Sequence, residues 1–151
     1  MEKLAMADTD FIHLARAMRK VEFFAPLTME QLESVLKYIM LCRYKAGERI
    51  FRQGDPGDAF YIIYDGAVSV GIKHLVLFTK QVARLGPGDF FGEMALLAKD
   101  PRSATVTALE TTRLFVLLSA DFAFVLKSNP AFATEMVKLA ERRKFMSRQG
   151  K

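Results

Sequence analysis

The sequence predicts an α+β fold: an antiparallel β-roll of the jelly-roll-like, double-stranded β-helix type, flanked by N-terminal helices and by two C-terminal helices. The first indication is glycine, because eight of the nine glycines lie between Gly47 and Gly92, mostly in turn-like settings. Short runs of β-branched and aromatic residues separate these turns. Turns about eight to twelve residues apart are typical of antiparallel sandwiches and barrels. Outside this region the apolar residues recur at helical spacing instead.

The N-terminal helical part, residues 9–41, is predicted to hold two helices. Apolar residues between Phe11 and Met18 indicate the first helix. The second is expected to begin at Thr28. The Thr28 hydroxyl can cap a backbone N–H group while the Gln31 side chain reaches back, which is the arrangement known as a capping box.

Residues 42–118 are predicted to form the β-roll. Its strands are expected at residues 49–52, 59–64, 67–72, 81–85, 103–109 and 113–118. The stretch 75–78, Leu-Val-Leu-Phe, is apolar where a polar turn is expected. It indicates either strands that continue to the tip of a hairpin or an apolar patch that awaits a partner.

Residues 119–146 are predicted to form the two C-terminal helices. Ser119 is expected to cap the first of them, over residues 121–127. Pro130 is expected to begin the second, because proline suits the first position of a helix. A chain of 151 residues can bury the core of one domain, so residues 1–151 are expected to form a single unit.

The net charge of +5 is concentrated at the C-terminal end. Residues 138–151 hold six bases and one acid, whereas residues 1–137 hold sixteen of each. A neutral body with a basic last helix lacks the diffuse basic face of a DNA-binding domain, so no direct nucleic-acid binding is expected. The simplest explanation of the tail is a solvated helix face ahead of a linker.

Other features of the composition indicate a cytoplasmic protein. The single cysteine, Cys42, excludes an internal disulfide framework and fits a reducing compartment. No apolar run approaches the roughly eighteen residues of a membrane-spanning helix. The N-terminus mixes acids and bases among its apolar residues, unlike a secretory signal. We therefore expect no membrane insertion by this chain.

The segment 90–106, FFGEMALLAKDPRSATV, interrupts the series of strands. Gly92 would let the backbone approach a ligand closely, because glycine has no Cβ atom. Met94 to Leu97 would form one helical turn, and the N–H groups and dipole at a helix N-terminus favour a phosphate. Ala95 is small enough for a ligand to lie on it.

An arginine and an acid complete this arrangement. Asp100-Pro101 would stiffen the return of the chain and bring Arg102 back toward the helical turn, where its guanidinium can pair with two phosphate oxygens. The Glu93 carboxylate can accept a hydrogen bond from a sugar hydroxyl beside the phosphate. Alone, Glu93 could be a first-turn acid that favours the helix dipole, and Arg102 a surface residue. Together they indicate a site for a nucleoside monophosphate.

The same segment resembles the phosphate-binding cassette of cyclic-nucleotide-binding domains. In that family F-G-E-(aliphatic)-(Ala/Gly)-L is followed by a short variable stretch and R-(Ser/Thr/Ala)-A-(Thr/Ser)-V. The matching residues are Phe91, Gly92, Glu93, Met94, Ala95, Leu96, Arg102, Ser103, Ala104, Thr105 and Val106. The glycine-containing turns and the flanking helices agree as well. The resemblance extends over nearly the whole chain, and it is strongest to bacterial members and to members attached to ion channels.

The resemblance implies a set of ligand-binding residues. Glu93 would bind the ribose 2′-hydroxyl and Arg102 the cyclic phosphate, with backbone groups of the neighbouring residues completing the phosphate site. The implied set is Val70, Phe91, Gly92, Glu93, Met94, Ala95, Arg102, Ser103, Arg142 and Arg143.

Four members of this set also have ordinary structural explanations. Val70 would line the apolar side of the purine, or it is simply a core residue. Ser103 would touch the phosphate or the base, or it only begins a strand. Arg142 or Arg143 could supply a polar contact from the last helix, which would close over the base, or both belong to a solvated helix face.

The function that the resemblance implies is a sensor. It would bind cyclic AMP, in preference to cyclic GMP, and move its C-terminal helices, with an effector domain fused or docked there. The alternative is an interaction module that kept the roll and lost the ligand, although the cassette is intact.

No enzymatic role and no metal are expected. The chain has two histidines, too few for the ligand cluster of a metal-dependent roll enzyme. It also lacks a Gly-x-Ser-x-Gly elbow and a Walker-type loop.

Overall fold

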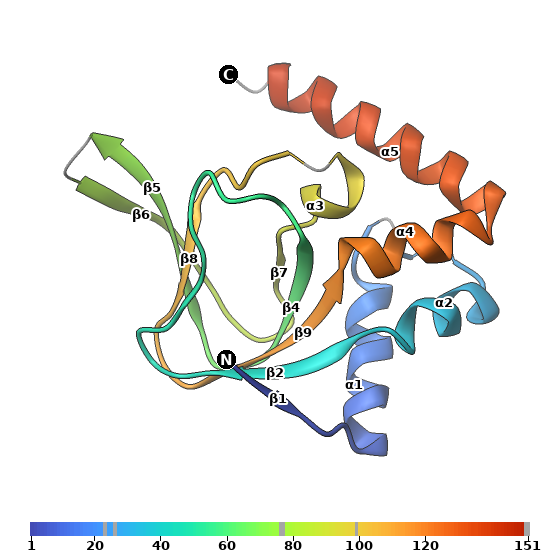
Figure 1. Cartoon of the computed structure of the whole chain (residues 1–151), viewed down its shortest axis with the longest axis horizontal. Coiled ribbons are helices and arrows are strands. Elements are labelled where there is room, and N and C mark those ends of the chain that lie inside the picture. The colour runs from blue at the N-terminus through green and yellow to red at the C-terminus, as the bar shows by residue number, and fades with distance from the viewer. Residues whose placement is uncertain (23, 26, 76–77, 99, 150–151) are drawn as a thin grey trace.

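The computed structural model describes residues 1–22, 24–25, 27–75, 78–98 and 100–149. The elements along the chain are β1 (Glu2–Leu4), α1 (Asp8–Arg19), α2 (Met29–Leu36), β2 (Met40–Tyr44), β3 (Arg49–Phe51), β4 (Ala59–Asp65), β5 (Val68–Leu75), β6 (Phe78–Leu85), β7 (Phe90–Phe91), α3 (Met94–Leu97), β8 (Thr105–Ala108), β9 (Thr112–Leu118), α4 (Ser119–Lys127) and α5 (Pro130–Gln149). The strands pair antiparallel in a five-stranded sheet, β1-β2-β9-β4-β7, and a four-stranded sheet, β3-β8-β5-β6. The predicted α+β class with an antiparallel roll between helices is confirmed (Figure 1).

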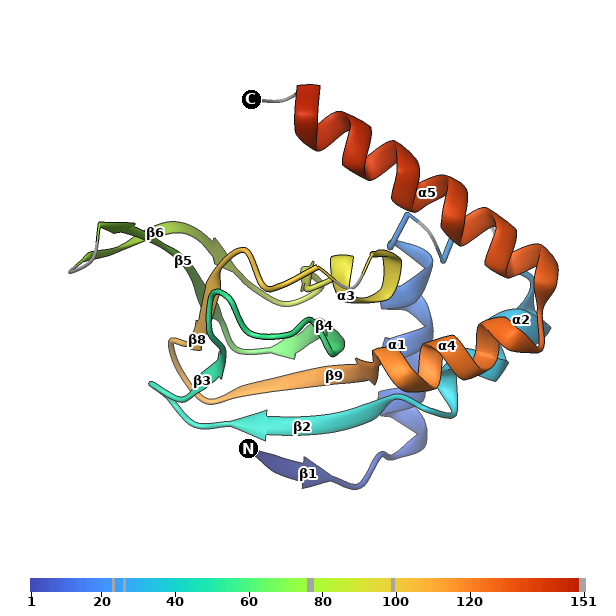
Figure 2. The ribbon, with the colours of Figure 1, turned by 45° about the horizontal axis from the view of Figure 1, so that its top comes forward.

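The helices gather on one side of the roll. In Figure 2 the strands curl together on one side, whereas α1, α2 and α4 lie together on the other. The last helix, α5, follows α4 and packs against both α4 and α3. None of the helices in the described part of the chain is long and apolar enough to cross a membrane.

Strand β4 shows why two apolar cores form. Its sequence AFYIIYD is almost continuously apolar, as expected for a strand that is buried on both faces, with successive side chains pointing to opposite sides. Phe60 and Ile62 belong to the core that is shared with the helices. Tyr61 and Ile63, which alternate with them, belong to the core inside the roll.

Three short strands differ from the sequence expectation. β2 begins at Met40, inside the segment predicted to be helical, and pairs with β9 along its whole length. β1 and β7 are three and two residues long, too short for an alternating pattern, and they are defined only by the neighbours with which they pair. Strands β5 and β6 continue to Leu75 and Phe78, which pair with each other; residues 76 and 77 lie outside the described residues.

The two predicted helix caps had different outcomes. The capping box of α2 is confirmed, since the Gln31 N–H donates to Thr28 Oγ1 at 3.2 Å and the Thr28 N–H donates to Gln31 Oε1 at 3.0 Å. The cap by Ser119 was wrong. Leu118 is the N-cap of α4, with no side-chain capping bond. The Ser119 backbone N–H donates to the Asp58 carbonyl oxygen at 2.9 Å, and the helix begins at Ser119, two residues before the predicted start at 121.

Helix α1 is attached to the roll through a buried carboxylate. The Tyr64 hydroxyl donates to Asp10 Oδ1 at 2.8 Å, and the Ala7 N–H donates to Asp10 Oδ2 at 2.8 Å. The Arg113 guanidinium lies 4.3 Å from the centre of the Tyr64 ring. The bonds from Ala7 and Tyr64 lower the pKa of Asp10, because they favour its charged form.

We predict that Tyr64→Phe lowers the free energy of unfolding at pH 7, because it removes one of the two hydrogen bonds to the ionised Asp10. The folded-state pKa of Asp10 lies below its ordinary value of 3.8. The stabilisation that Asp10 gains from its hydrogen bonds is therefore present above about pH 4, and it is lost as the pH falls further and the carboxylate is protonated. In urea denaturation, the difference from the unsubstituted chain should shrink below about pH 4.

Tyr38→Phe is the control for this prediction, because it removes a tyrosine hydroxyl away from Asp10. A stability difference for Tyr64→Phe that stays constant down to pH 3, or the same pH dependence for Tyr38→Phe, contradicts the role given to Asp10.

Candidate functional site

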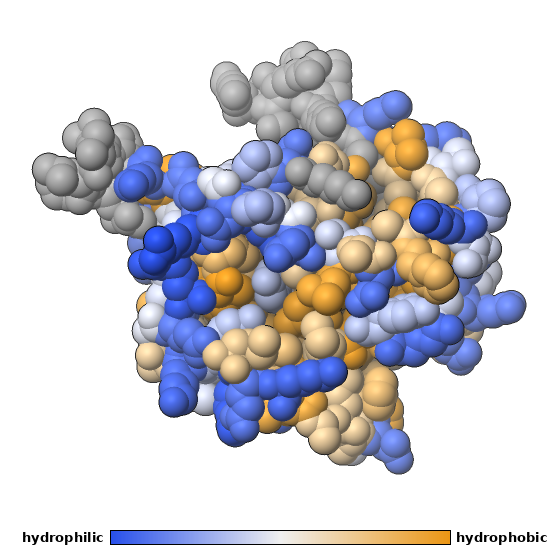
Figure 3. All heavy atoms as spheres, viewed as in Figure 1, coloured by the Kyte–Doolittle hydropathy of each residue, from blue (hydrophilic) through white to orange (hydrophobic). Residues whose placement is uncertain are grey.

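A cavity of about 900 Å³ opens between the roll, α3 and α5. The lining residues are Glu22, Phe51, Val70, Phe91, Gly92, Glu93, Met94, Ala95, Asp100, Pro101, Arg102, Ser103, Ala104, Val106 and Arg142. Figure 3 shows apolar residues in the middle of the face seen in Figure 1, with hydrophilic residues around them. The structure thus brings nine of the ten residues predicted from the sequence to one cavity. The side chain of the tenth, Arg143, lies outside the described residues.

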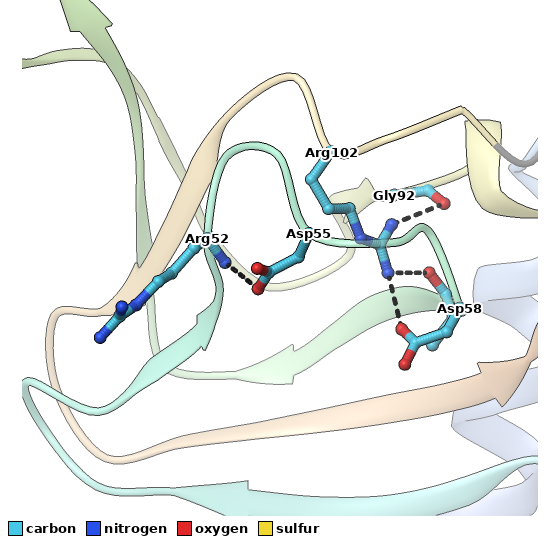
Figure 4. Close-up of polar contacts among 6 residues, drawn as sticks. Arg52, Asp55, Asp58, Gly92 and Arg102 are labelled. Atoms are coloured by element: carbon cyan, nitrogen blue, oxygen red, sulfur yellow. Dashed lines mark hydrogen bonds and ion pairs between the residues drawn. The ribbon is translucent and has the colours of Figure 1, made fainter.

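Arg102 is the buried cation of this cavity, with a side chain that is 4% exposed. Its Nη2 donates to the Ala59 carbonyl oxygen at 2.7 Å and lies 3.4 Å from Asp58 Oδ1. Its Nη1 donates to the Gly92 carbonyl oxygen at 3.4 Å. Figure 4 shows the guanidinium pointing into the space between Asp58 and Gly92. The predicted return of Arg102 toward the start of α3 is therefore found in the structure.

Two aromatic rings, those of Phe51 and Tyr61, lie against the Arg102 guanidinium. The Arg102 guanidinium carbon lies 4.0 Å from the centre of the Phe51 ring and 5.8 Å from that of Tyr61, which are cation–π distances. The Tyr61 ring stacks on Phe91 at 4.9 Å. Burial raises the pKa of Tyr61 to about 12, so its hydroxyl stays protonated at neutral pH. These contacts fix the plane of the guanidinium.

One polar atom of Arg102 lacks a partner. Among the buried side-chain nitrogen and oxygen atoms of the described residues, Nε of Arg102 alone has no hydrogen-bond acceptor. A buried N–H group without an acceptor costs roughly 1–3 kcal/mol. An anionic group in the cavity would supply that acceptor and would also compensate the buried positive charge.

Gly92 makes the close contact with Arg102 possible. Its φ of +79° lies in the left-handed region, which glycine adopts without strain. A Cβ atom at this position would lie 2.8 Å from Arg102 Nη1 and 3.1 Å from the Ala59 carbonyl oxygen. A larger residue would therefore displace the guanidinium.

The predicted helical turn is α3, at Met94–Leu97. Glu93 is its N-cap residue, half-buried at the cavity wall, and its side chain makes no capping hydrogen bond. The sequence left open whether Glu93 is a first-turn acid. The structure places Glu93 one position earlier, as the N-cap residue, and Glu93 lines the cavity. Ala95 is buried, as a surface for close packing requires.

The other predicted residues are more exposed. Val70 of β5 is half-buried and packs against the core of the roll as well as lining the cavity. Ser103 is exposed and precedes β8 instead of beginning it. Arg142 is exposed on α5.

The loop between β3 and β4 holds the Arg102 backbone, and the sequence did not indicate this. The Arg102 N–H donates to the Asp55 carbonyl oxygen at 2.8 Å, and the Gly54 N–H donates to the Arg102 carbonyl oxygen at 2.7 Å. Gly57 lies against the chain just before Arg102, so that an added Cβ would be 2.6 Å from the Asp100 carbonyl oxygen. The glycine-rich composition signalled a turn here, but nothing signalled its partner more than forty residues later.

Six further residues that line the cavity were not predicted as ligand-binding residues: Glu22, Phe51, Asp100, Pro101, Ala104 and Val106. Asp100, Pro101, Ala104 and Val106 belong to the same segment, 90–106, as the predicted residues. Glu22 and Phe51 reach the cavity only through the packing of distant segments. Within the described ranges, no group of three or more His, Cys, Asp or Glu side chains could hold a metal ion.

Comparison with known proteins gives one consistent result. A family model described as cyclic nucleotide-binding domain matches residues 41–129. The chain is 37% identical over 135 residues to a cyclic nucleotide-gated potassium channel of Mesorhizobium japonicum, covering 89% of this chain and 36% of the channel. It is 36% identical over 126 residues to the cyclic AMP receptor protein of Thermus thermophilus, covering 83% of this chain and 58% of the receptor. The chain thus spans between about a third and three-fifths of the length of these two relatives.

Solved structures that resemble this chain agree with the family match. The N-terminal domain of a transcriptional regulator from Streptomyces coelicolor superposes with a TM-score of 0.76 at 28% identity, covering 89% of this chain and 94% of that one. The regulatory domain of Toxoplasma gondii PKA, in co-crystals with cAMP, superposes with a TM-score of 0.74 at 30% identity, covering 80% of this chain and 46% of that one.

We predict that Gly57→Ala destabilises the chain by about 1–3 kcal/mol, the usual cost of overpacking, because its Cβ would push on the Asp100 backbone. Gly86→Ala is the matched control, since a Cβ at that position meets nothing within 4 Å. It should change stability by no more than about 1 kcal/mol. Equal urea midpoints for the two variants would show that the 53–58 loop does not press on the segment before Arg102.

Proposed function

Because the chain belongs to the cyclic nucleotide-binding domain family, we propose that it is a sensor that binds a cyclic nucleotide in the cavity beside Arg102. Binding is coupled to movement of α4 and α5. Residues 42–118 form the ligand-binding roll with its phosphate-binding cassette at 90–106, and residues 119–146 form the hinge and the lid. The chain acts by binding and not by catalysis.

The observation that carries this proposal is the buried guanidinium of Arg102 beside a cavity of about 900 Å³. Small-molecule sites are typically about 300–1,000 Å³ and combine apolar walls with a few placed polar groups. The Nε of Arg102 has no acceptor among the described residues, and a cyclic phosphate carries the oxygens that it needs. The cavity therefore fits a ligand with one anionic group and an apolar body.

The remaining lining residues divide between the other parts of such a ligand. Glu93 accepts a hydrogen bond from the ribose 2′-hydroxyl, and the backbone of Gly92, Met94 and Ala95 contacts the phosphate. Ser103 contacts the phosphate or the base. The base lies against an apolar wall to which Phe51, Phe91, Val70 and Val106 contribute, with Arg142 or Arg143 above it on α5.

Cyclic AMP is the ligand that we favour over cyclic GMP. The support is that one matched receptor is named for cyclic AMP and that two matched structures contain cAMP. The matches also include cGMP-dependent protein kinases at 35–39% identity, so parallel titrations with both nucleotides decide the preference. The effector is a domain or partner that responds to α5, and the chain itself acts in the cytoplasm without entering the membrane.

We predict that Arg102→Ala weakens binding of cyclic AMP by about 100-fold, or about 3 kcal/mol, because it removes a charge pair in a sheltered site. Isothermal titration calorimetry measures this. Arg84→Ala is the control, because Arg84 is an exposed arginine on β6 that does not line the cavity. Arg84→Ala should leave the dissociation constant within about twofold of the unsubstituted value.

A thermal melt distinguishes the sensor from the interaction module. A ligand that binds the native state must raise the melting temperature. If neither nucleotide at millimolar concentration shifts the melting temperature of the unsubstituted chain, the interaction module is the correct function. An unchanged dissociation constant for Arg102→Ala would remove Arg102 from the site.

We also predict that cyclic AMP changes the distance between α5 and the roll. Spin labels at Val82→Cys on β6 and Glu141→Cys on α5, in a Cys42→Ala background, report that distance by pulsed electron paramagnetic resonance; both positions are exposed. Saturating nucleotide should shift the distance distribution, because a ligand favours the conformation that it binds more tightly. The same concentration should shift it much less in the Arg102→Ala variant. Identical distributions with and without nucleotide would exclude the coupling.

A further inference from the structure

Two residues at the cavity come from outside the roll. Of the lining residues, thirteen lie between Phe51 and Val106, whereas Glu22 follows α1 and Arg142 lies on α5. These two side chains carry opposite charges, and both are exposed to solvent at the cavity. The segment before the roll therefore contributes one acidic residue to the cavity, and the segment after the roll contributes one basic residue.

Glu22 lies next to residues that are buried in the core. Its neighbours Val21 and Phe24 are 1% and 0% exposed and belong to the core beneath the helices. The Val21 N–H donates to the Met18 carbonyl oxygen at 3.1 Å, and the Phe24 N–H donates to the Val21 carbonyl oxygen at 3.0 Å. The backbone of Glu22 therefore lies between two residues that are anchored in the core, as a positioning residue requires.

Arg142 lies on α5 beyond the anchored first half of the helix. Phe132 and Met136 anchor that first half in the helical core, at 2% and 3% exposed. Among the residues of α5 whose side chains the structure describes, Met136 is the last that is buried. Arg142 follows six residues later, about 9 Å further along the helix axis. An attraction at the cavity would hold this distal part of α5 in place.

We propose that Glu22 is a positioning residue for α5: its carboxylate attracts Arg142 across the cavity and keeps the helix over the ligand. The ligand half of this inference rests on the proposed function.

The attraction is between exposed charges, so it is weak and depends on salt. Exposed pairs contribute only a fraction of a kcal/mol in most measurements. At physiological ionic strength, charges further apart than about 8 Å are largely screened. Both the effect of Glu22 and its coupling to Arg142 should therefore fade at high salt.

The first test needs no nucleotide. Spin labels at Val82→Cys and Glu141→Cys in the Cys42→Ala background give the distance from the roll to distal α5. Glu22→Gln should broaden this distribution toward longer distances at low salt, and 0.5 M salt should do the same to the chain with Glu22. Glu110→Gln, an exposed acid in the turn between β8 and β9, should change nothing. An unchanged distribution for Glu22→Gln overturns the proposal.

The second test is a double-mutant cycle on cyclic AMP affinity, by titration calorimetry. Glu22→Gln should weaken binding about two- to fivefold in the parent chain. It should have no effect when Arg142→Gln is already present, because the attraction is then absent. Equal effects in both backgrounds would show that Glu22 acts without Arg142 and overturn the pairing. If the parent chain binds neither nucleotide, the proposed function fails, while the nucleotide-free distances still decide the role of Glu22.

Discussion

The organisation of the site depends on one constraint, the burial of the Arg102 guanidinium. Removing a cation from water costs several kcal/mol unless the surroundings replace its hydration. The chain provides two backbone carbonyl groups, at Ala59 and Gly92, and an aromatic ring, Phe51. Each of these has to come within a few ångströms of the same side chain. Gly92 suits this packing, because a Cβ there would lie only 2.8 Å from Arg102 Nη1.

The proposed coupling between Arg102 and the helices would pass through the two cores. Strand β4 separates them, with Tyr61 and Ile63 in the roll core and Phe60 and Ile62 in the helical core. The segment 90–97 crosses the same boundary. Phe91 packs in the roll, whereas Leu96 packs with Phe122 and Phe132 of α4 and α5. Close-packed interiors transmit a displacement, so a shift of α3 must be accommodated by α4 and α5.

The sequence predicted the site residues that lie in one short segment, but not those that come from other parts of the chain. Gly92, Glu93 and Arg102 were predictable because one short segment contains them all and its pattern resembles a known cassette. Phe51 and Glu22 were not, because strand register and helix packing bring them to the cavity from segments that have no sequence signal in common with it. The capping box at Thr28 was predictable for a similar local reason. The cap at Ser119 failed because a backbone bond to Asp58 fixes the start of α4 instead.

The partners of Arg102 also determine which ligand charge the cavity accepts. The carbonyl groups of Ala59 and Gly92 orient the guanidinium, but as neutral dipoles they leave its charge in place. Asp58 carries a charge, yet its side chain is 78% exposed and its oxygen lies 3.4 Å away, so water screens much of its effect. The cavity therefore keeps a positive charge at Arg102, and two acidic residues, Glu93 and Glu22, also line it. A ligand with a single anionic group at Arg102 and neutral hydrogen-bond donors elsewhere suits both the arginine and the acidic residues. A ligand with several anionic groups would place negative charges beside those acidic residues.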